Sequence, residues 1–226
     1  MALLKIARMG NPVLRKPASV VEDPNAPWVR PLVSDMIETM EDAGGTGLAA
    51  PQVHQPWRVV VFFVSGERLS GMPGDVAQDL TVLINPVVEL LGRERALGWE
   101  GCLSVPGLRG VVPRHLRIRY RATGLDGETI EREAEGFHAR VVQHECDHLD
   151  GILYPQQMTD HRLLVFFEEL QRHPIDLAAF LAETRPGCGA RLPRAGARHC
   201  SKRCCPKCRL MAGPERPCAG LRGGSA

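Results

Sequence analysis

The chain has 226 residues, of which 44% are apolar and 24% charged, a balance typical of a globular protein with its own core. No apolar stretch approaches the ~18 residues of a transmembrane helix, and the N-terminal residues do not have the pattern of a secretory signal. The net charge of +2 is unevenly divided, because residues 185–226 hold ten Lys or Arg and one acid (+9), which leaves −7 on residues 1–184.

The first predicted element is a helix over residues 28–43, where apolar side chains recur with a period of about 3.6 residues. Gly44 and Gly45 are placed to end it. Residues that are β-branched or alternate in polarity predict four strands, and Gly124–Gly127 predicts a hairpin turn between the last two. These strands are expected at 58–64, 81–91, 116–122 and 128–133.

A second predicted helix carries Phe137, Val141, His144 and His148 on one face, since they are spaced by four, three and four residues. Gly151 is placed to end this helix. Apolar residues over 163–170 predict a third helix. The order of helices and strands predicts an α+β fold.

The last 42 residues form a separate region in composition. Residues 185–226 contain no Val, Ile, Phe, Trp or Tyr, but hold six of the eight cysteines. So few large apolar side chains cannot offset the entropy of ordering, so we expect a disordered basic tail after a folded domain at 1–184. This tail has three interpretations: a small metal knuckle, a basic arm that binds ribosomal RNA, or an extension without function.

The strongest chemical signal is the segment His144-Glu145-Cys146-Asp147-His148. Two histidines four residues apart on a helix lie one turn apart, so their rings can bind one metal ion. Glu145 lies beside the first of them and is placed to act on a water at that ion. Cys146 is turned about 200° away from His144 and is expected to pack in the core. The alternative is a polar helix face with two ordinary histidines.

A third metal ligand is needed, and Cys102 is the best candidate. It lies in Glu100-Gly101-Cys102-Leu103-Ser104, at an expected loop or strand end. A thiolate is a strong ligand for a borderline divalent metal. A small buried apolar residue is the default interpretation of a free cysteine, and both interpretations stay open on this evidence alone.

The segment Gly45-Thr46-Gly47-Leu48-Ala49-Ala50-Pro51-Gln52 is the third feature. Its small residues allow a ligand to approach the backbone closely. Gln52 offers an amide donor for a developing oxyanion. A helix end followed by a turn would explain the glycines, but not the Gln after an apolar run.

These three motifs together resemble those of the peptide deformylases, which are marked by GxGLAAPQ, EGCLS and HExxHLxG in this order. Here they are GTGLAAPQ (45–52), EGCLS (100–104) and HECDHLDG (144–151). The resemblance covers roughly residues 1–170. It implies an α+β fold in which a central helix bearing HExxH is surrounded by antiparallel β-sheets.

The resemblance also implies roles for individual residues. Cys102, His144 and His148 would be the metal ligands, and Glu145 the general base and acid. The oxyanion would be bound by Gln52 and the backbone N–H of Leu103. Gly47 would lie beside the substrate backbone.

The activity implied is removal of the N-formyl group from the initiator methionine of nascent chains, which releases formate. The implied cofactor is one divalent metal ion per chain, usually Fe(II), which Zn(II), Ni(II) or Co(II) can replace. The implied partners are N-formylmethionyl nascent peptides, with transient contact to the ribosome and none to membrane or DNA. We expect a bacterial cytoplasmic location, with an organelle as the alternative.

Three further residues are candidates for substrate binding. Phe137 and Val141 lie on the histidine face of their helix and would form part of the methionine pocket, although both could simply be core residues. Arg109 resembles a substrate-side arginine of the family, and could also be a solvated loop charge.

Two other functions stay open from the sequence. An HExxH endopeptidase would need a third His or Glu ligand, such as His161 or Glu168, and would leave Cys102 idle. A non-enzymatic protein that binds RNA or the ribosome through its tail would need no intact ligand set.

Overall fold

The computed structural model describes residues 2–184. They divide into a first unit that ends at Asp176 and a second that begins at Leu177, of which helix α5 (Leu177–Thr184) is described. No helix within 2–184 is long and apolar enough to cross a membrane. The tail predicted at 185–226 lies outside the described residues.

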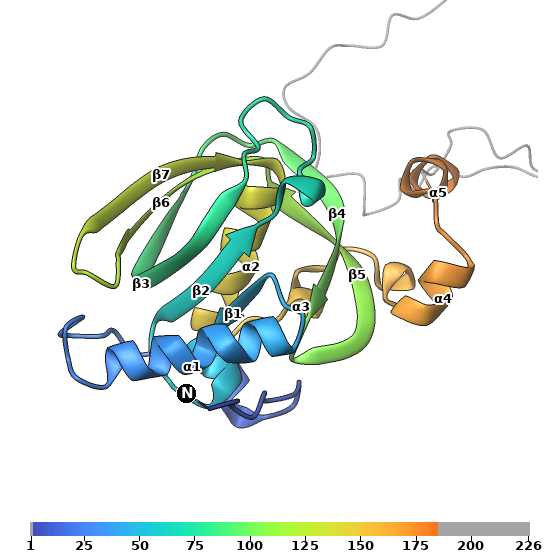
Figure 1. Cartoon of the computed structure of the whole chain (residues 1–226). Coiled ribbons are helices and arrows are strands. Elements are labelled where there is room, and N and C mark those ends of the chain that lie inside the picture. The colour runs from blue at the N-terminus through green and yellow to red at the C-terminus, as the bar shows by residue number, and fades with distance from the viewer. Residues whose placement is uncertain (1, 185–226) are drawn as a thin grey trace, which may run out of the picture. The chain divides into compact units, whose positions relative to one another are not determined.

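The first unit is built from two antiparallel sheets and the helices packed on them, as Figure 1 shows. The five-stranded sheet has the order β1-β2-β3-β6-β7, and the three-stranded sheet the order β4-β5-β8. The strands are β1 (Gly47–Ala49), β2 (Val59–Val64), β3 (Gln78–Leu90), β4 (Arg95–Cys102), β5 (Val105–His115), β6 (Arg117–Thr123), β7 (Thr129–Glu135) and β8 (Val165–Phe166). This arrangement confirms the predicted α+β fold.

Helices cover both faces of the larger sheet. The helices of the first unit are α1 (Val29–Asp42), α2 (Gly136–Leu149), α3 (Tyr154–Gln157) and α4 (Phe167–Arg172), with short 3₁₀ turns at Pro12–Arg15, Ala50–Val53, Gly66–Arg68 and His161–Leu163. In strand β2 successive side chains alternate between two cores: Val60 and Phe62 pack with α2, whereas Val59 and Val61 pack with α1. The sheet is therefore held between α1 and α2.

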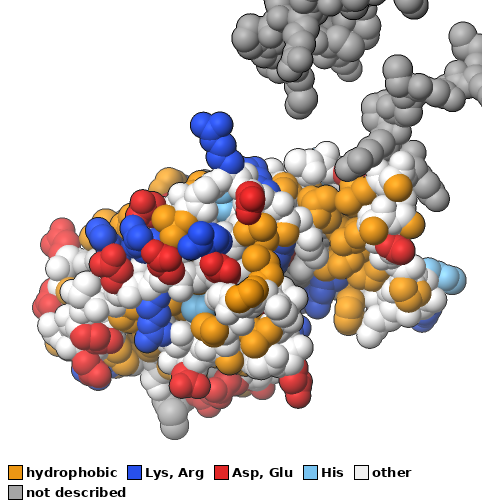
Figure 2. All heavy atoms as spheres, turned by 90° about the horizontal axis from the view of Figure 1, so that it is seen from above, with side chains coloured by type: hydrophobic (Ala, Val, Ile, Leu, Met, Phe, Trp, Pro, Cys, Tyr) orange, Lys and Arg blue, Asp and Glu red, His pale blue; other side chains and the backbone are white. Residues whose placement is uncertain are grey.

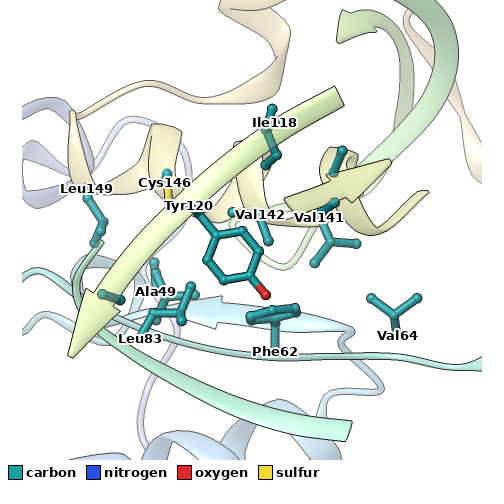
Figure 3. Packing of buried hydrophobic residues seen from close by; sticks show 14 residues of the cluster. Ala49, Phe62, Val64, Leu83, Ile118, Tyr120, Val141, Val142, Cys146 and Leu149 are labelled. Carbon is teal, nitrogen blue, oxygen red and sulfur yellow. The ribbon is translucent and has the colours of Figure 1, made fainter. Parts of the chain in front are cut away.

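The core between α2 and the sheet surrounds the ring of Tyr120. Figure 3 shows this ring between Val141 and Val142 of α2 on one side and Phe62 of β2 on the other. The rings of Tyr120 and Phe62 meet edge to face at 6.5 Å. Close packing on this side fixes where the opposite, polar face of α2 lies.

Helix α2 begins where a remote loop supplies its cap. Glu135 at the N-cap makes no side-chain cap bond, but the Asp75 carboxylate accepts the N–H groups of Phe137 (2.9 Å) and His138 (3.1 Å). The helix ends at Leu149, and Gly151 follows with φ of 74°, a conformation that glycine adopts freely. The predicted helix and its stop at Gly151 are confirmed.

The other long elements also follow the predictions. Helix α1 matches the predicted 28–43 helix, and β2, β3, β6 and β7 match the four predicted strands to within three residues. The Gly124 N–H binds the Glu128 carbonyl, which closes the predicted hairpin turn between β6 and β7.

The third predicted helix is wrong in its first half. Leu163 ends a 3₁₀ turn, and Val165 and Phe166 form strand β8, which pairs with Leu108 and Arg109 of β5. Only from Phe167 onward is the chain helical. The exposed edge of β5 offers backbone hydrogen bonds that outweigh the helical spacing of the apolar residues.

Candidate active site

Three atoms that could ligate a metal ion meet beside helix α2. The ligand atoms of Cys102, His144 and His148 all lie within 4.8 Å of one another. The Sγ atom of Cys102 is 3.3 Å from Nε2 of His148, and the centroids of the two imidazole rings are 5.0 Å apart. One helical turn brings the two rings together, as their spacing predicts.

Cys102 reaches the helix from the end of strand β4. Leu103 and Ser104 form the tight turn that joins β4 to β5, and Cys102 pairs with Val105 across it. Leu103 directly follows Cys102 in the EGCLS motif, so its backbone N–H belongs to the same turn as the sulfur-bearing residue.

Glu100 fixes the orientation of the His144 ring. Its Oε2 atom lies 2.8 Å from Nδ1 of His144, which leaves Nε2 free for an ion. Burial opposes the ionisation of Glu100, but hydrogen bonds from His144 and Arg114 outweigh it and hold the pKa of this carboxyl far below its usual range. Glu100 is therefore a buried anion behind the ligand set.

Two arginines neutralise Glu100. Arg114 donates to it from Nε at 2.9 Å and Nη2 at 3.0 Å, and Arg140 donates from Nη1 at 2.8 Å. Arg114 also binds Asp147 at 2.6 Å. This network ties β4 and β5 to helix α2, so the strand that carries Cys102 is fixed relative to the helix that carries both histidines.

The two histidines differ in their electrostatic environment. Burial alone would lower the pKa of His144, but hydrogen bonds with Cys102 and Glu100 raise it well above the ordinary value. Burial and the positive charges of His144 and Arg114 lower the pKa of His148 well below it. A cation bound at these ligands would therefore displace a proton from the site.

Glu145 is a buried carboxyl next to the ligands. Burial, together with the charge of Glu100, raises its pKa to about 7, although His144 opposes this shift. A Cβ on Gly47 would lie 2.4 Å from Oε1 of Glu145, so only glycine allows β1 to approach this carboxyl so closely. Its other oxygen, Oε2, is buried without a hydrogen-bond partner among residues 2–184.

The amide of Gln52 points at the same place. Its Nε2 donates to Sγ of Cys102 at 3.4 Å and to the hydroxyl of Ser104 at 3.2 Å. Its Oε1 accepts the N–H of Ala49 at 2.9 Å, which fixes the orientation of the side chain. Gln52 lies in the 3₁₀ turn that follows β1, and it is 1% exposed.

A cavity of about 610 Å³ opens onto this cluster. It is lined by all of the residues predicted to bind or act on a substrate: Gly47, Gln52, Leu103, Arg109, Phe137, Val141 and Glu145. Cys102 and His144 also line it, whereas His148 is 1% exposed and lies behind. Phe137 and Val141 thus border the cavity as well as the core.

Several charged or aromatic residues around this cavity were not predicted from the sequence. No role was predicted for Glu100, although it lies in the same motif as Cys102. Arg68, Trp99 and Arg140 line the cavity as well. Arg140 lies one helical turn before His144, and this spacing is the signal that places it on the same face.

Other candidate ligands do not join the cluster. Cys146 is buried in the core against the sheet, as predicted. Among the described residues, Cys102, His144 and His148 are the group of metal-ligating side chains that comes together, and neither His161 nor Glu168 belongs to it. The third ligand that an endopeptidase would need from these two residues is therefore absent from the cluster.

The residues present fit a bound divalent metal. A thiol and two imidazoles are the donors that a borderline metal prefers. Oε2 of Glu145, at the cavity beside these donors, is buried without a hydrogen-bond partner in the described part of the chain, and a water on such an ion would supply one.

Comparison with known proteins gives the family. The sequence profile described as "Polypeptide deformylase" matches residues 3–163. The chain belongs to the polypeptide deformylase family. The chain is 54% identical over 155 residues to peptide deformylase 1 of Bordetella pertussis, an alignment that covers 69% of this chain and 87% of that one. It is 48% identical over 171 residues to peptide deformylase 1 of Prochlorococcus marinus, which covers 76% and 88%.

Solved peptide deformylase structures share the fold. The crystal structure of peptide deformylase from Ehrlichia chaffeensis has a TM-score of 0.66 and 32% identity, covering 71% of this chain and 90% of that one. The Met-Ala-Ser-bound class I type b peptide deformylase from Acinetobacter baumannii has a TM-score of 0.63 and 35% identity, covering 70% and 99%. The family predicted from the three motifs is thus confirmed.

Proposed function

We propose that this chain removes the N-formyl group from the N-terminal methionine of newly made peptides, with the residues around Cys102 as its catalytic centre. The observation that carries the proposal is the meeting of Cys102, His144 and His148 within 4.8 Å, with the Glu145 carboxyl beside them at the cavity. The reaction is hydrolysis of a formamide to formate and a free α-amine.

Cys102, His144 and His148 would hold one divalent metal ion. When bound, such an ion lowers the pKa of a coordinated water toward neutrality and polarises the formyl oxygen. The thiolate and imidazole donors suit Fe(II), Zn(II), Ni(II) and Co(II). The resemblance of the motifs favours Fe(II) as the native metal.

Glu145 is proposed as the proton carrier. Its carboxylate accepts a proton from the attacking water and then delivers that proton to the leaving α-amine. A pKa of about 7 suits both halves of this role, because neither protonation state is strongly favoured at neutral pH. The close backbone of Gly47 holds the carboxyl toward the cavity.

Gln52 and Leu103 are proposed to stabilise the negative charge that forms on the formyl oxygen. The Gln52 amide already points its N–H groups toward Cys102, and its orientation is fixed by Ala49. Loss of one such donor typically raises the barrier by ~3–4 kcal/mol. The backbone N–H of Leu103 would be the second donor.

The substrate would lie along the cavity. Gly47 would approach its backbone, Phe137 and Val141 would contact the methionine side chain, and Arg109 would face the peptide. The relative from Acinetobacter baumannii was solved with Met-Ala-Ser, a peptide that begins with methionine. The formyl carbon carries only a hydrogen, so a tight site around it would exclude acetylated and ordinary peptide substrates.

The substrates would be nascent chains. We propose transient contact with the ribosome and action in a bacterial cytoplasm, since relatives come from bacteria such as Bordetella pertussis and Prochlorococcus marinus.

Replacing the proposed proton carrier tests the function. Glu145→Gln keeps the shape of the side chain but cannot carry the proton, so formate release from formyl-Met-Ala-Ser should fall by at least ~10²-fold. Metal content, measured by mass spectrometry of the purified protein, should stay at that of the wild type.

The matched control is Glu168→Gln, which changes an exposed carboxyl outside the cluster and should leave both values unchanged. Substantial turnover by the Glu145 variant would remove Glu145 from its role. Metal loss in the Glu168 variant would show that Glu168 is a metal ligand, as the endopeptidase alternative requires.

A further inference from the structure

Arg109 faces the cavity with unused donors. It lies on β5, and among its guanidinium nitrogens Nη1 donates to the carbonyl of Leu108 at 3.1 Å. No carboxylate within residues 2–184 forms an ion pair with it, unlike Arg114 and Arg140. A cation in this state is suited to donate hydrogen bonds to a carbonyl or carboxylate of a bound peptide, and under the proposed function Arg109 faces that peptide.

The guanidinium is held close to the catalytic centre. A Cβ on Gly101 would lie 2.1 Å from Nη1 of Arg109, so the group rests directly on the backbone of Gly101. Gly101 is the neighbour of Cys102 in β4. The Arg109 guanidinium therefore lies beside the strand that carries the proposed metal ligand.

An aromatic ring lies on the other side of this guanidinium. The central carbon of the Arg109 guanidinium lies 4.5 Å from the centroid of the Phe167 ring, a cation–π contact. Strand β8 brings it there: Val165 pairs with Arg109, so Phe167, two residues on, is its diagonal neighbour on the same face. Figure 1 shows α4, which begins at Phe167, next to β5.

The ring belongs to a segment beyond the matched family profile. That profile ends at residue 163, whereas β8 and the start of α4 cover 165–172. Phe167 keeps 38% of its surface exposed and Phe166 65%, so neither ring is held by a core. An exposed aromatic residue whose ring covers a substrate-facing arginine has a use other than packing.

We propose that Phe167 is a positioning residue for substrate binding, which fixes the Arg109 guanidinium between its ring and Gly101. An arginine side chain without this support samples many rotamers, and a peptide must then order it on binding. The segment after residue 163 thereby becomes part of the substrate site. The proposal rests on the proposed function and assigns a residue to it.

Steady-state kinetics of formate release from formyl-Met-Ala-Ser test this assignment. Phe167→Leu keeps an apolar side chain but removes the π face, and should raise KM about two- to fivefold with kcat unchanged. Phe167→Trp restores a π face and should return KM to the wild-type value or below it. Phe166→Leu is the matched control in the same segment and should change neither constant.

A double variant shows whether the effect passes through Arg109. In an Arg109→Met background, Phe167→Leu should add nothing to the increase in KM that the first change causes. Full additivity of the two changes, an unchanged KM in Phe167→Leu, or equal losses in the Leu and Trp variants would each overturn the assignment. Absence of formate release by the wild-type chain would instead overturn the proposed function itself.

Discussion

Glu100 is the residue on which the geometry of the cluster depends most. It orients the ring of His144 and at the same time receives Arg114 and Arg140, all of them buried. If this buried anion lost its charge, Arg140 would lose its anionic partner and Arg114 would keep only Asp147. The proposed metal ligands are therefore supported by a carboxylate that is not one of them.

Glu100→Gln should weaken metal binding about 10- to 100-fold, because the neutral amide has a single acceptor oxygen and cannot serve both His144 and the two arginines. It should also lower the free energy of unfolding by about 3 kcal/mol, since buried Arg140 loses its anionic partner and Arg114 keeps only Asp147. Competition with a chromophoric chelator measures the first effect, and urea unfolding the second.

Glu133→Gln is the control for that variant. Glu133 pairs with Arg119 at 2.6 Å, but its side chain is 49% exposed, in a row of ion pairs along β6 and β7. Figure 2 shows acidic and basic side chains intermingled on this side of the molecule. Exposed ion pairs contribute ~0–1 kcal/mol to the free energy of unfolding, so stability should change little. Metal affinity should stay unchanged, because Glu133 pairs with Arg117 and Arg119, outside the ligand cluster. Equal losses of metal affinity and stability in the two variants would show that Glu100 does not support the ligand cluster.

For single residues, the sequence predicted which side chains form the cluster, but not the hydrogen bonds that hold them in place. Cys102, His144 and His148 were predicted as a group because two of them share a helix face and the third belongs to an accompanying motif. The bonds of Glu100 could not be predicted, because they depend on the register of β4 against β5, in which Glu100 lies opposite Gly110 and near Arg114.

Among the elements, helix α2 has two different environments. The face that bears His144 and His148 is polar and charged, whereas the other face packs on the sheet around Tyr120 (Figure 3). His138 belongs to the second environment: it is 1% exposed, and its Nε2 lies 3.2 Å from the Tyr120 hydroxyl. Burial lowers the pKa of His138 to about 4, an effect that Arg132 adds to and Asp75 opposes.

This lowered pKa predicts acid sensitivity of the fold. The unfolded chain binds a proton at His138 near pH 6.5, whereas the folded chain does so only near pH 4. Stability is therefore fully present above pH 6.5 and falls between pH 6.5 and 4, by at most ~1.4 kcal/mol per pH unit from this residue.

Urea unfolding at intervals from pH 7 to pH 4.5 measures the slope. His138→Gln has no titrating group at this position and should show a shallower loss of stability on acidification than the wild type. Parallel curves for the two proteins would show that His138 does not titrate differently on folding.

The elements also show where prediction from sequence stops. Helices α1 and α2 were predicted because they have one apolar face each. Strands β4 and β5 were not predicted, since Gly98, Gly101, Pro106 and Gly107 interrupt their polarity pattern and their pairing is what makes them strands. A helix was predicted where strand β8 lies, because the local sequence does not show that the edge of β5 is open for pairing.

The whole molecule combines an acidic domain with a strongly basic end. The family profile and all lining residues of the cavity lie within residues 3–163. The chain from 185 to 226 carries +9, a charge that would bind nucleic acid in a salt-dependent way. The motifs alone were therefore sufficient for the family, and they contain no information on this part of the chain.

Deletion of residues 185–226 should leave kcat and KM for formyl-Met-Ala-Ser nearly unchanged, because no residue of the proposed catalytic centre lies there. The same protein should lose any salt-sensitive binding to ribosomes that the full chain has. A large fall in kcat after the deletion would show that the tail contributes to the active enzyme.

The central claim is that Cys102, His144 and His148 hold the metal at which the formyl group is hydrolysed. Anaerobic formate release from formyl-Met-Ala-Ser, measured as Fe(II) is added to metal-free protein, tests it most directly. Release should rise until one Fe(II) per chain is bound, and Cys102→Ala should release none under the same conditions. Equal release by the wild type and Cys102→Ala, or by the metal-free chain, would contradict the account.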